Sequence, residues 1–413
     1  MPFTPDPRID AASTAPVDHP VPEDLTRLAQ DLVRIPSVTG NEGEVAAFAE
    51  GWLRAAGLDV EIIEEERGRP NIIATTGDPK GPLFAFNGHI DTVPVPDEDA
   101  WSHPPFGGEI EEGRLYGRGA IDMKASCAAG MWAAAQFAGR EDLPGRVQVL
   151  LVVDEEKGGE TGSRVVASAM ESGRLDRPDG IFSGELSYLH VRTAERGIFQ
   201  FKIRFRGRAA HTARSRVDGI NAIAAASRGI LALEHHIDRF HPAVGYPVLS
   251  VNRVEGGSAP NQVPPTATVL VDRRLVPGET PEEVEAEVRE VLDAIPEEIE
   301  DGRRIPVEYD IITSGEGIAR VTEPNMTDPD EAFVRTLWDQ AEGVLGSRPD
   351  AFTDWGGATD ARYFRKLGIP MVIFGPTGAG AHAPDEYVDL SSLGAVAEVY
   401  RRTFARSLGI GSG

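Results

Sequence analysis

Cysteine is almost absent from the sequence, and no apolar run reaches the ~18 residues that a membrane-spanning helix needs. The single cysteine, Cys127, has no partner for an intrachain disulfide. It stands in a run of small residues, where we interpret it as a buried packing residue. Neither a membrane nor an oxidising compartment is indicated, so we expect a cytoplasmic protein with no membrane partner.

Positive charge is also scarce, because 41 Lys and Arg residues face 66 Asp and Glu residues and leave a formal net charge of -25. Such a surface repels phosphates, which argues against a nucleic-acid partner. It would repel an anionic substrate too, but salt screens that repulsion beyond about 8 Å, so local cations can dominate near a site. No G-x-S-x-G elbow, Walker A sequence or complete dinucleotide fingerprint occurs.

The 413 residues are enough for more than one domain. Residues 1–22 are rich in Pro, Asp and Ala and lack a basic start and an apolar stretch, so we expect a mobile tail and not a signal peptide. Over residues 23–192, and again over 318–413, apolar residues at helical spacing alternate with short apolar runs typical of buried strands. Together the two stretches predict one discontinuous α/β domain.

Residues 193–317 have a different pattern. Phe199, Phe201 and Phe205 alternate with polar residues, which predicts a strand with one solvated face. The apolar spacing then predicts, in order, a helix over 221–238, strands near 248–254 and 267–272, a helix over 281–294 and a strand over 307–312. The order β-α-β-β-α-β is that of a split βαβ sandwich, so we predict an inserted α+β domain.

Acidic and histidine residues stand just after three predicted strands of the discontinuous domain. They are His89 and Asp91 after the first strand, Glu155 and Glu156 after the second, and Glu185 after the third. Open α/β sheets bind ligands beyond the carboxyl ends of their strands, so the three groups together predict a site. Imidazole and carboxylate ligands suit Zn²⁺, Mn²⁺ or Co²⁺, and the cysteine count excludes a cysteine-type structural zinc site.

Single residues leave alternatives open. In the H-x-D pair, Asp91 would orient His89, or the two would be a surface histidine beside a turn aspartate. Asp122 follows a glycine-rich segment and opens a helix, so it would either cap that helix or bridge two metals with its two oxygens.

The other acidic residues have similar alternatives. Glu155 and Glu156 would be a general base and a ligand, because two carboxylates after a buried strand need cations to compensate them, or they would lie in a solvated loop. Glu185 and His382 are each weak signals, since loops often carry such residues.

Nine motifs occur along the chain: FNGHIDTVP, GRGAIDMK, VVDEEKGG, SGELS, GRAAHTA with DGINAI, PNQVP, DRRLVPGE, GGATDARYF and GAHAPDEYV. In this order the set resembles the M20 metallopeptidases and deacylases, which include acetylornithine deacetylase, succinyl-diaminopimelate desuccinylase, aminoacylase and glutamate carboxypeptidase. The resemblance covers nearly all of the chain after the tail. It implies a zinc-exopeptidase-like catalytic domain with a central mixed sheet, and an inserted ferredoxin-like lid and dimerisation domain.

The resemblance also implies a ligand set for two divalent metals, zinc first and cobalt or manganese next. His89 and Glu185 would bind one metal, Glu156 and His382 the other, and Asp122 would bridge them. The peptide bond after Asp122 would be cis, as it is in relatives.

Further roles follow from the resemblance. Asp91 would orient His89, and Glu155 would take a proton from a metal-bridging water and pass it to the leaving amine. His211 would stabilise the oxyanion, in several relatives from the partner subunit, which implies a homodimer formed through the lid. The residues expected to contact substrate are Asn261, Arg274, Gly356 and Gly357.

The function implied is hydrolysis of the amide bond of a small N-acyl amino acid. Glu185, where an aspartate would be more like the aminopeptidase branch, favours the deacylase branch, whereas Gln262 departs from the apolar residue frequent in relatives. A dipeptidase or carboxypeptidase acting on short peptides is the alternative within the family, and a non-catalytic metal- or ligand-binding protein is the alternative outside it.

Overall fold

The structure is a computed structural model that describes residues 17–295, 298–300, 303–305, 307–315, 317–318, 321–351 and 357–411. The described residues form two compact units. The first takes those of Met1–Thr193, Met326–Phe352 and Thr359–Gly413, and the second takes those of Ala194–Asn325 and Thr353–Ala358. The second unit therefore interrupts the first in the sequence. The sequence analysis places the boundaries at 193 and 317, whereas this division ends the interruption at Asn325 and also gives Thr353–Ala358 to the second unit.

A six-stranded mixed sheet forms the centre of the first unit, in the order β1-β2-β6-β3-β7-β16. Its strands are β1 (Asp59–Ile63), β2 (Asn71–Gly77), β3 (Leu83–His89), β6 (Arg146–Val152), β7 (Gly180–Ser183) and β16 (Met371–Ile373). β6, β3, β7 and β16 run parallel, whereas β1 and β2 are antiparallel to their neighbours. The parallel strands are buried almost throughout because helices cover both faces. The predicted central mixed sheet is confirmed.

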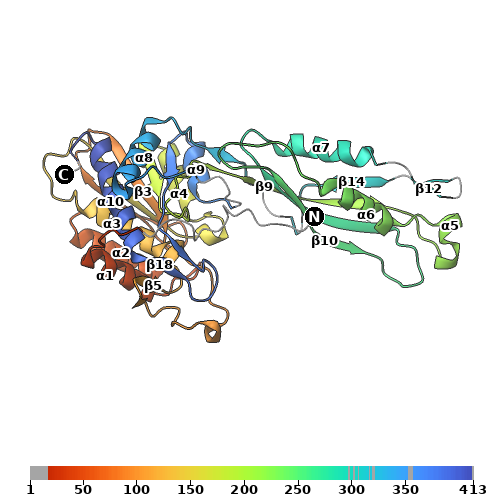
Figure 1. Cartoon of the computed structure of the whole chain (residues 1–413), viewed down its shortest axis with the longest axis horizontal. Helices are drawn as coiled ribbons and strands as arrows, with labels where there is room; N and C mark the ends of the chain where they lie inside the picture. The colour runs from red at the N-terminus through yellow and green to blue at the C-terminus, as the bar shows by residue number, and fades with distance from the viewer. Residues whose placement is uncertain are drawn as a thin grey trace. The chain divides into compact units, whose positions relative to one another are not determined.

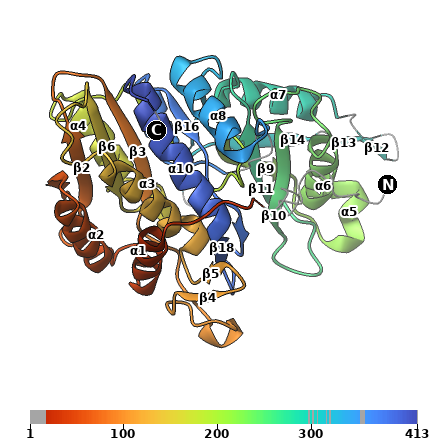
Figure 2. The same cartoon turned by 60° about the vertical axis from the view of Figure 1, so that its left-hand side comes forward.

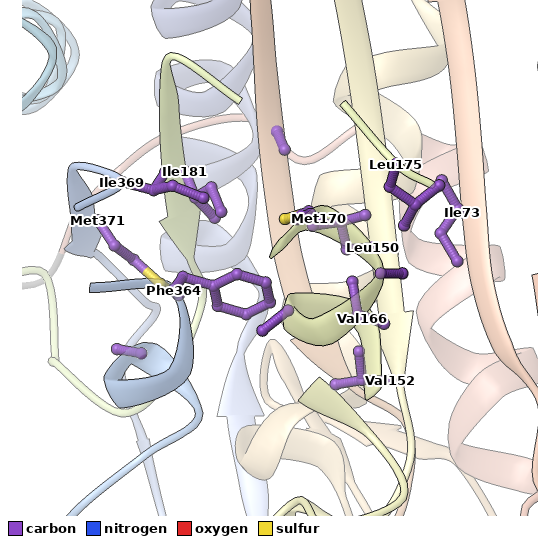
Figure 3. Close-up of a cluster of buried hydrophobic side chains, with 14 of the residues drawn as sticks. Ile73, Leu150, Val152, Val166, Met170, Leu175, Ile181, Phe364, Ile369 and Met371 are labelled. Carbon is purple, nitrogen blue, oxygen red and sulfur yellow. The ribbon is translucent and has the colours of Figure 1, made fainter. Parts of the chain in front are cut away.

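One face of this sheet is covered by α4 (Ser163–Glu171) and α9 (Ala361–Lys366). Figure 3 shows the apolar side chains of this layer, among them Leu150 of β6, Val166 of α4 and Phe364 of α9, which pack together and are fully buried. Alternate residues of a strand point to opposite faces, so the intervening side chains of the same strands form a second layer.

The second layer is aromatic. Phe86 of β3 contacts Phe182 of β7 and Tyr400 of α10 (Leu390–Ser407), with ring centroids 5.9 and 5.5 Å apart respectively. The helix α3 (Ala125–Ala135) lies across β3 and β6 on this face, and α10 packs on α3 (Figure 2). A side chain at Gly130 of α3 would place its Cβ 2.3 Å from the Phe86 ring, so only glycine allows this close approach.

Three more helices and a small sheet complete the first unit. The helices are α1 (Glu23–Arg34), α2 (Gly43–Ala55) and α8 (Ala332–Leu345). The antiparallel sheet has the order β17-β18-β5-β4, with β17 (Gly378–Ala379), β18 (Tyr387–Asp389), β5 (Arg114–Tyr116) and β4 (Glu109–Glu111). Across the described ranges, none of the helices combines the length and apolarity needed to span a membrane.

The second unit has a four-stranded antiparallel sheet in the order β10-β11-β9-β14. Its elements are β9 (Gly197–Arg206), α5 (Ser215–Asp218), α6 (Ala222–Leu233), β10 (Val248–Gly256), β11 (Thr266–Leu275), α7 (Pro281–Asp293) and β14 (Glu308–Ile312). The long helices α6 and α7 cover one face (Figure 1), where Phe201 and Phe205 of β9 are buried. The alternating pattern of β9 is confirmed, because its other face carries exposed Arg204 and Arg206.

Some elements differ from the sequence prediction. The helix expected over 221–238 ends at Leu233, because Glu234 leaves the helical conformation and its carboxylate accepts the backbone N–H of Val251 at 2.9 Å. This tertiary contact outweighs the local preference of the chain. The sequence analysis did not predict the small sheet of the first unit or the short strands β8 (Ala194–Glu195), β12 (Glu298–Glu300), β13 (Arg303–Ile305) and β15 (Asn325–Met326).

Candidate metal centre

The ends of the parallel strands bring distant parts of the sequence to one edge of the sheet. β3 ends at His89, β6 leads into the turn Glu155–Lys157, and β7 leads to Glu185. Because β3, β6 and β7 run parallel, their carboxyl ends lie at the same edge. The strands are buried almost throughout and paired with their neighbours, so they hold these polar residues in place.

Two groups of ligand atoms converge at this edge. His89, Asp122 and Glu185 form one group and Asp122, Glu156 and His382 the other, each with its atoms within 4.8 Å of one another. Asp122 Oδ1 lies 3.1 Å from His89 Nε2, and Asp122 Oδ2 lies 3.2 Å from His382 Nε2. The remaining approaches are 3.7 Å from His89 Nε2 to Glu185 Oε1 and 3.1 Å from His382 Nε2 to Glu156 Oε2. The folding of the chain thus brings all five predicted ligands together.

Asp122 directs one oxygen to each group and does not act as a helix cap. The segment Ala120–Lys124 departs from helical geometry at Asp122 and Met123, and α3 begins only at Ala125 with no side-chain cap. The capping alternative is therefore wrong. The peptide bond between Asp122 and Met123 is cis, as the resemblance predicts.

Asp91 has more contacts than the sequence suggests. Nδ1 of His89 lies 3.0 Å from the backbone oxygen of Asp91 and 3.5 Å from its carboxylate. The carboxylate accepts the hydroxyl of Thr39 at 2.8 Å and the backbone N–H groups of Glu155 and Glu156 at 3.1 and 3.3 Å. Asp91 therefore holds the β6 turn as well as the imidazole.

The pKa values show how much negative charge gathers here. Burial raises the pKa of Glu185 to about 8, although nearby His89 lowers it. Burial and then the charge of Glu185 raise the pKa of Glu155 well above its ordinary value. Hydrogen bonds to Asp122 and Glu156 raise the pKa of His382 to about 10. The carboxylates stabilise positive charge on the imidazole and on any cation bound between them.

The comparisons with known proteins agree with this geometry. Residues 85–406 match Peptidase family M20/M25/M40. Succinyl-diaminopimelate desuccinylase of Parvibaculum lavamentivorans is 32% identical over 403 residues, covering 94% of this chain and 96% of that protein. The chain belongs to the M20 family. It is accordingly a hydrolase of the metallopeptidase kind, and the resemblance drawn from the nine motifs is confirmed.

Solved structures of the M20 type share the fold. A tripeptidase from Staphylococcus aureus superposes with a TM-score of 0.71 at 21% identity, covering 94% of this chain and 99% of that one. The YXEP protein of Bacillus subtilis, described as a dinuclear metal binding peptidase from the M20 family, gives 0.66 at 20% identity, with 94% and 98% covered. At these identities the likeness concerns the fold.

The M20 residues expected to contact substrate lie in the second unit. His211 precedes a short turn, and its Nδ1 accepts the backbone N–H of Ala213 at 3.2 Å. Asn261 accepts the backbone N–H of Thr212 through its own backbone oxygen at 3.0 Å, so it lies beside His211. Gly357 also belongs to this unit. Gly356 lies outside the described residues.

Arg274 is already engaged by a neighbour. Its Nε donates to Asp272 Oδ1 at 2.7 Å, and Asp272 also accepts Gln200 at 2.8 Å. A carboxylate bound by Arg274 would therefore share the guanidinium with Asp272.

Sequence reasoning missed a buried ion network behind the β6 turn. Arg69 Nη2 donates to Glu42 Oε1 and to Asp154 Oδ1, both at 2.8 Å. Asp154, whose φ of 70° is left-handed, directly precedes Glu155, so the network fixes the direction in which the turn leaves β6. The partners of Arg69 lie 27 and 85 residues away, and the only local signal is an aspartate before the two glutamates of VVDEEKGG.

Proposed function

We propose that this chain is a two-metal amidohydrolase that cleaves the amide bond of small N-acyl amino acids. The observation that carries the proposal is the pair of ligand groups that share Asp122, with the half-buried Glu155 beside them. The relative at 32% identity is named a desuccinylase of succinyl-diaminopimelate, and this supports an acylated amino acid as the substrate class.

The residues present fit two divalent ions. Each group combines one imidazole with two carboxylates, a donor set that suits Zn²⁺ and also Co²⁺ or Mn²⁺. Without cations, burial raises the pKa of both Glu155 and Glu185, and the charge of a neighbouring carboxylate raises each further. His89, Asp122 and Glu185 would hold one ion, and Asp122, Glu156 and His382 the other. We propose zinc as the native metal.

Bound ions would polarise the scissile carbonyl and lower the pKa of water near them. Glu155 would accept a proton from the attacking water and pass it to the leaving amine, since its carboxyl interacts with His89, Glu185 and Asp122 but belongs to neither ligand group. The carboxylate of Asp91 would accept the backbone N–H of Glu155 and so keep Glu155 in place. Asp91 would also orient His89.

One ring nitrogen of His211 has a hydrogen-bond partner in its own turn. Its Nδ1 accepts a hydrogen bond, so the neutral ring carries its proton on Nε2 and can donate there. We propose that this N–H stabilises the tetrahedral oxyanion. Arg274 would pair with the substrate carboxylate, and Asn261 with Gly356 and Gly357 would complete the contacts.

We further propose a homodimer formed through the second unit. β10 is an edge strand of its sheet, and edge strands readily pair with another chain. Val248 and Val254 of β10 are 45% and 56% exposed, and Leu231 of α6 is 80% exposed. Light scattering on the purified protein should give twice the 44.4 kDa chain mass, and a strictly monomeric result would contradict this proposal.

A substrate panel tests the function. Protein dialysed against a chelator and reloaded with zinc should hydrolyse N-succinyl or N-acetyl amino acids faster than dipeptides. Faster cleavage of dipeptides would favour the peptidase alternative. Zinc-dependent binding without hydrolysis of any compound would favour the non-catalytic alternative.

A further inference from the structure

The loops that carry Asp122 and His382 are joined to the same pair of strands, β5 and β18. β5 and β18 are antiparallel neighbours, with Tyr116 opposite Tyr387. The chain that leaves β5 reaches Asp122 six residues beyond Tyr116, and the chain that enters β18 carries His382. Glu386, the last residue before β18, therefore stands where the two loops cross.

Glu386 is fully buried and binds the Asp122 loop at several points. Its Oε1 accepts the backbone N–H groups of Ile121 and Asp122 at 3.1 and 3.2 Å. Its backbone oxygen accepts the N–H of Gly117 at 2.9 Å. Its Oε2 accepts Nη1 of Arg118 in an ion pair. The carboxylate thus holds the peptide that aims Asp122.

Arg118 continues the connection toward the other loop. It is 2% exposed, and its Nη2 approaches the backbone oxygen of Ala383, the residue after His382, at 3.4 Å. The guanidinium also lies over the ring of Trp101, 5.1 Å from its centroid. Arg118 therefore contacts Glu386 and the His382 loop at the same time.

Neither residue belongs to the two ligand groups of the described part of the chain. Burying an ion pair costs desolvation, and hydrogen bonds to both carboxylate oxygens of Glu386 offset part of this cost, although Nε of Arg118 has no hydrogen-bond partner.

The two ligand groups depend on this connection to different degrees. His89 lies within β3 and is 2% exposed, so the central sheet fixes it. The side chain of His382 is 52% exposed, and its loop has no place in that sheet. Loss of the contacts of Glu386 and Arg118 would therefore shift His382 relative to Asp122 more than it would shift His89.

We propose that Glu386 and Arg118 are positioning residues that set the spacing between Asp122 and His382 and thereby the affinity of the second metal position. The inference rests on the proposed two-metal function. Loss of a residue that orients a ligand typically weakens metal binding about 10- to 100-fold. We expect a loss of this size at the second position and a smaller one at the first.

The test is a metal titration. Chelator-treated protein is titrated with Co²⁺ and followed by visible absorption and calorimetry, which give two dissociation constants. The variants are Glu386→Gln, Arg118→Met and their combination. Because the two residues act through one connection, the double variant should lose little more metal affinity than the single variant with the larger loss.

The control is Glu398→Gln. Glu398 accepts Nε of Arg401 and of Arg402 at 2.8 and 2.6 Å within α10. The Glu398→Gln variant therefore weakens comparable bonds to arginine at a place away from the ligand loops. It should keep both wild-type dissociation constants. If Glu386→Gln does not fold, as judged by circular dichroism, Arg118→Lys carries the test, because it keeps the charge and loses the forked contact.

Folded Glu386→Gln or Arg118 variants that bind both ions as tightly as wild type would overturn the proposal. An equal loss of affinity at both metal positions would contradict the proposal that the two residues act mainly on the second position. If the wild-type protein binds fewer than two ions, the proposed two-metal function itself fails. The wild-type titration, run alongside, separates these outcomes.

Discussion

The carboxylate of Asp91 accepts the backbone N–H of Glu155, with 3.1 Å between Oδ1 and the nitrogen. The proposed general base is therefore positioned by the aspartate that the sequence assigned to the orientation of His89. Because Asp91 is fully buried, replacing it leaves several donors without an acceptor.

Asp91→Ala should lower kcat/KM about 10- to 100-fold, since both the imidazole and the β6 turn lose their support. The free energy of unfolding of the variant should fall by about 1–3 kcal/mol, measured by urea titration. Thr39→Val removes a single donor to the same carboxylate and should have the smaller effect. Equal activity of Asp91→Ala and wild type would refute a positioning role.

Glu155→Ala should reduce kcat by at least about 10²- to 10⁴-fold, because the proton acceptor is lost. Elemental analysis should find the same metal content as in wild type, since Glu155 belongs to neither ligand group. Glu160→Ala removes a carboxylate from the same loop that pairs with Arg164, and it should leave kcat unchanged. A fully active Glu155→Ala enzyme would remove Glu155 from the mechanism.

His211→Ala should lower kcat about 10²- to 10³-fold, the usual cost of losing one oxyanion donor. His211 is exposed, so the melting temperature should not change. His235→Ala removes another exposed histidine of the second unit and should keep the wild-type kcat. If the two variants behave alike, His211 has no catalytic role.

Gly130→Ala should destabilise the first unit by about 1–3 kcal/mol, because the new methyl group would overlap the Phe86 ring. Gly51 of α2 is the matched control, since a Cβ there meets no atom within 4 Å. Gly51→Ala should stabilise the protein by about 0.5–1 kcal/mol through its helix propensity. Urea denaturation curves of both variants measure the difference, and equal effects would contradict the close packing of α3 on β3.

The positions of His89, Glu156 and Glu185 could be predicted because strand ends are visible in the sequence, whereas His382 was assigned only through the family resemblance. The apolar run of β3 leads directly to His89, and parallel strands place their carboxyl ends together whatever the details of packing. Asp122 could not be decided in the same way. An aspartate before a helix has the same local sequence whether it caps or bridges, and only the approach of His89 and His382 separates the two.

The residues that support the ligands were less predictable. Arg69 contacts Asp154, and Arg118 contacts Glu386, across 85 and 268 residues of sequence. No local periodicity marks such pairs, because the burial of a charged side chain depends on segments that meet only in the folded chain. The end of α6 at Leu233 has the same origin, since a tertiary bond to Glu234 decides it.

The insertion of the second unit affects the order in which the protein is made. Translation delivers β3, β6 and β7 first, then all of residues 194–325, and only afterwards β16 and His382. During that interval the nascent first unit lacks β16, which is one neighbour of β7, and the imidazole of His382, whereas the second unit lacks only Thr353–Ala358. The proposed second metal position is therefore complete only when the ribosome has nearly finished the chain.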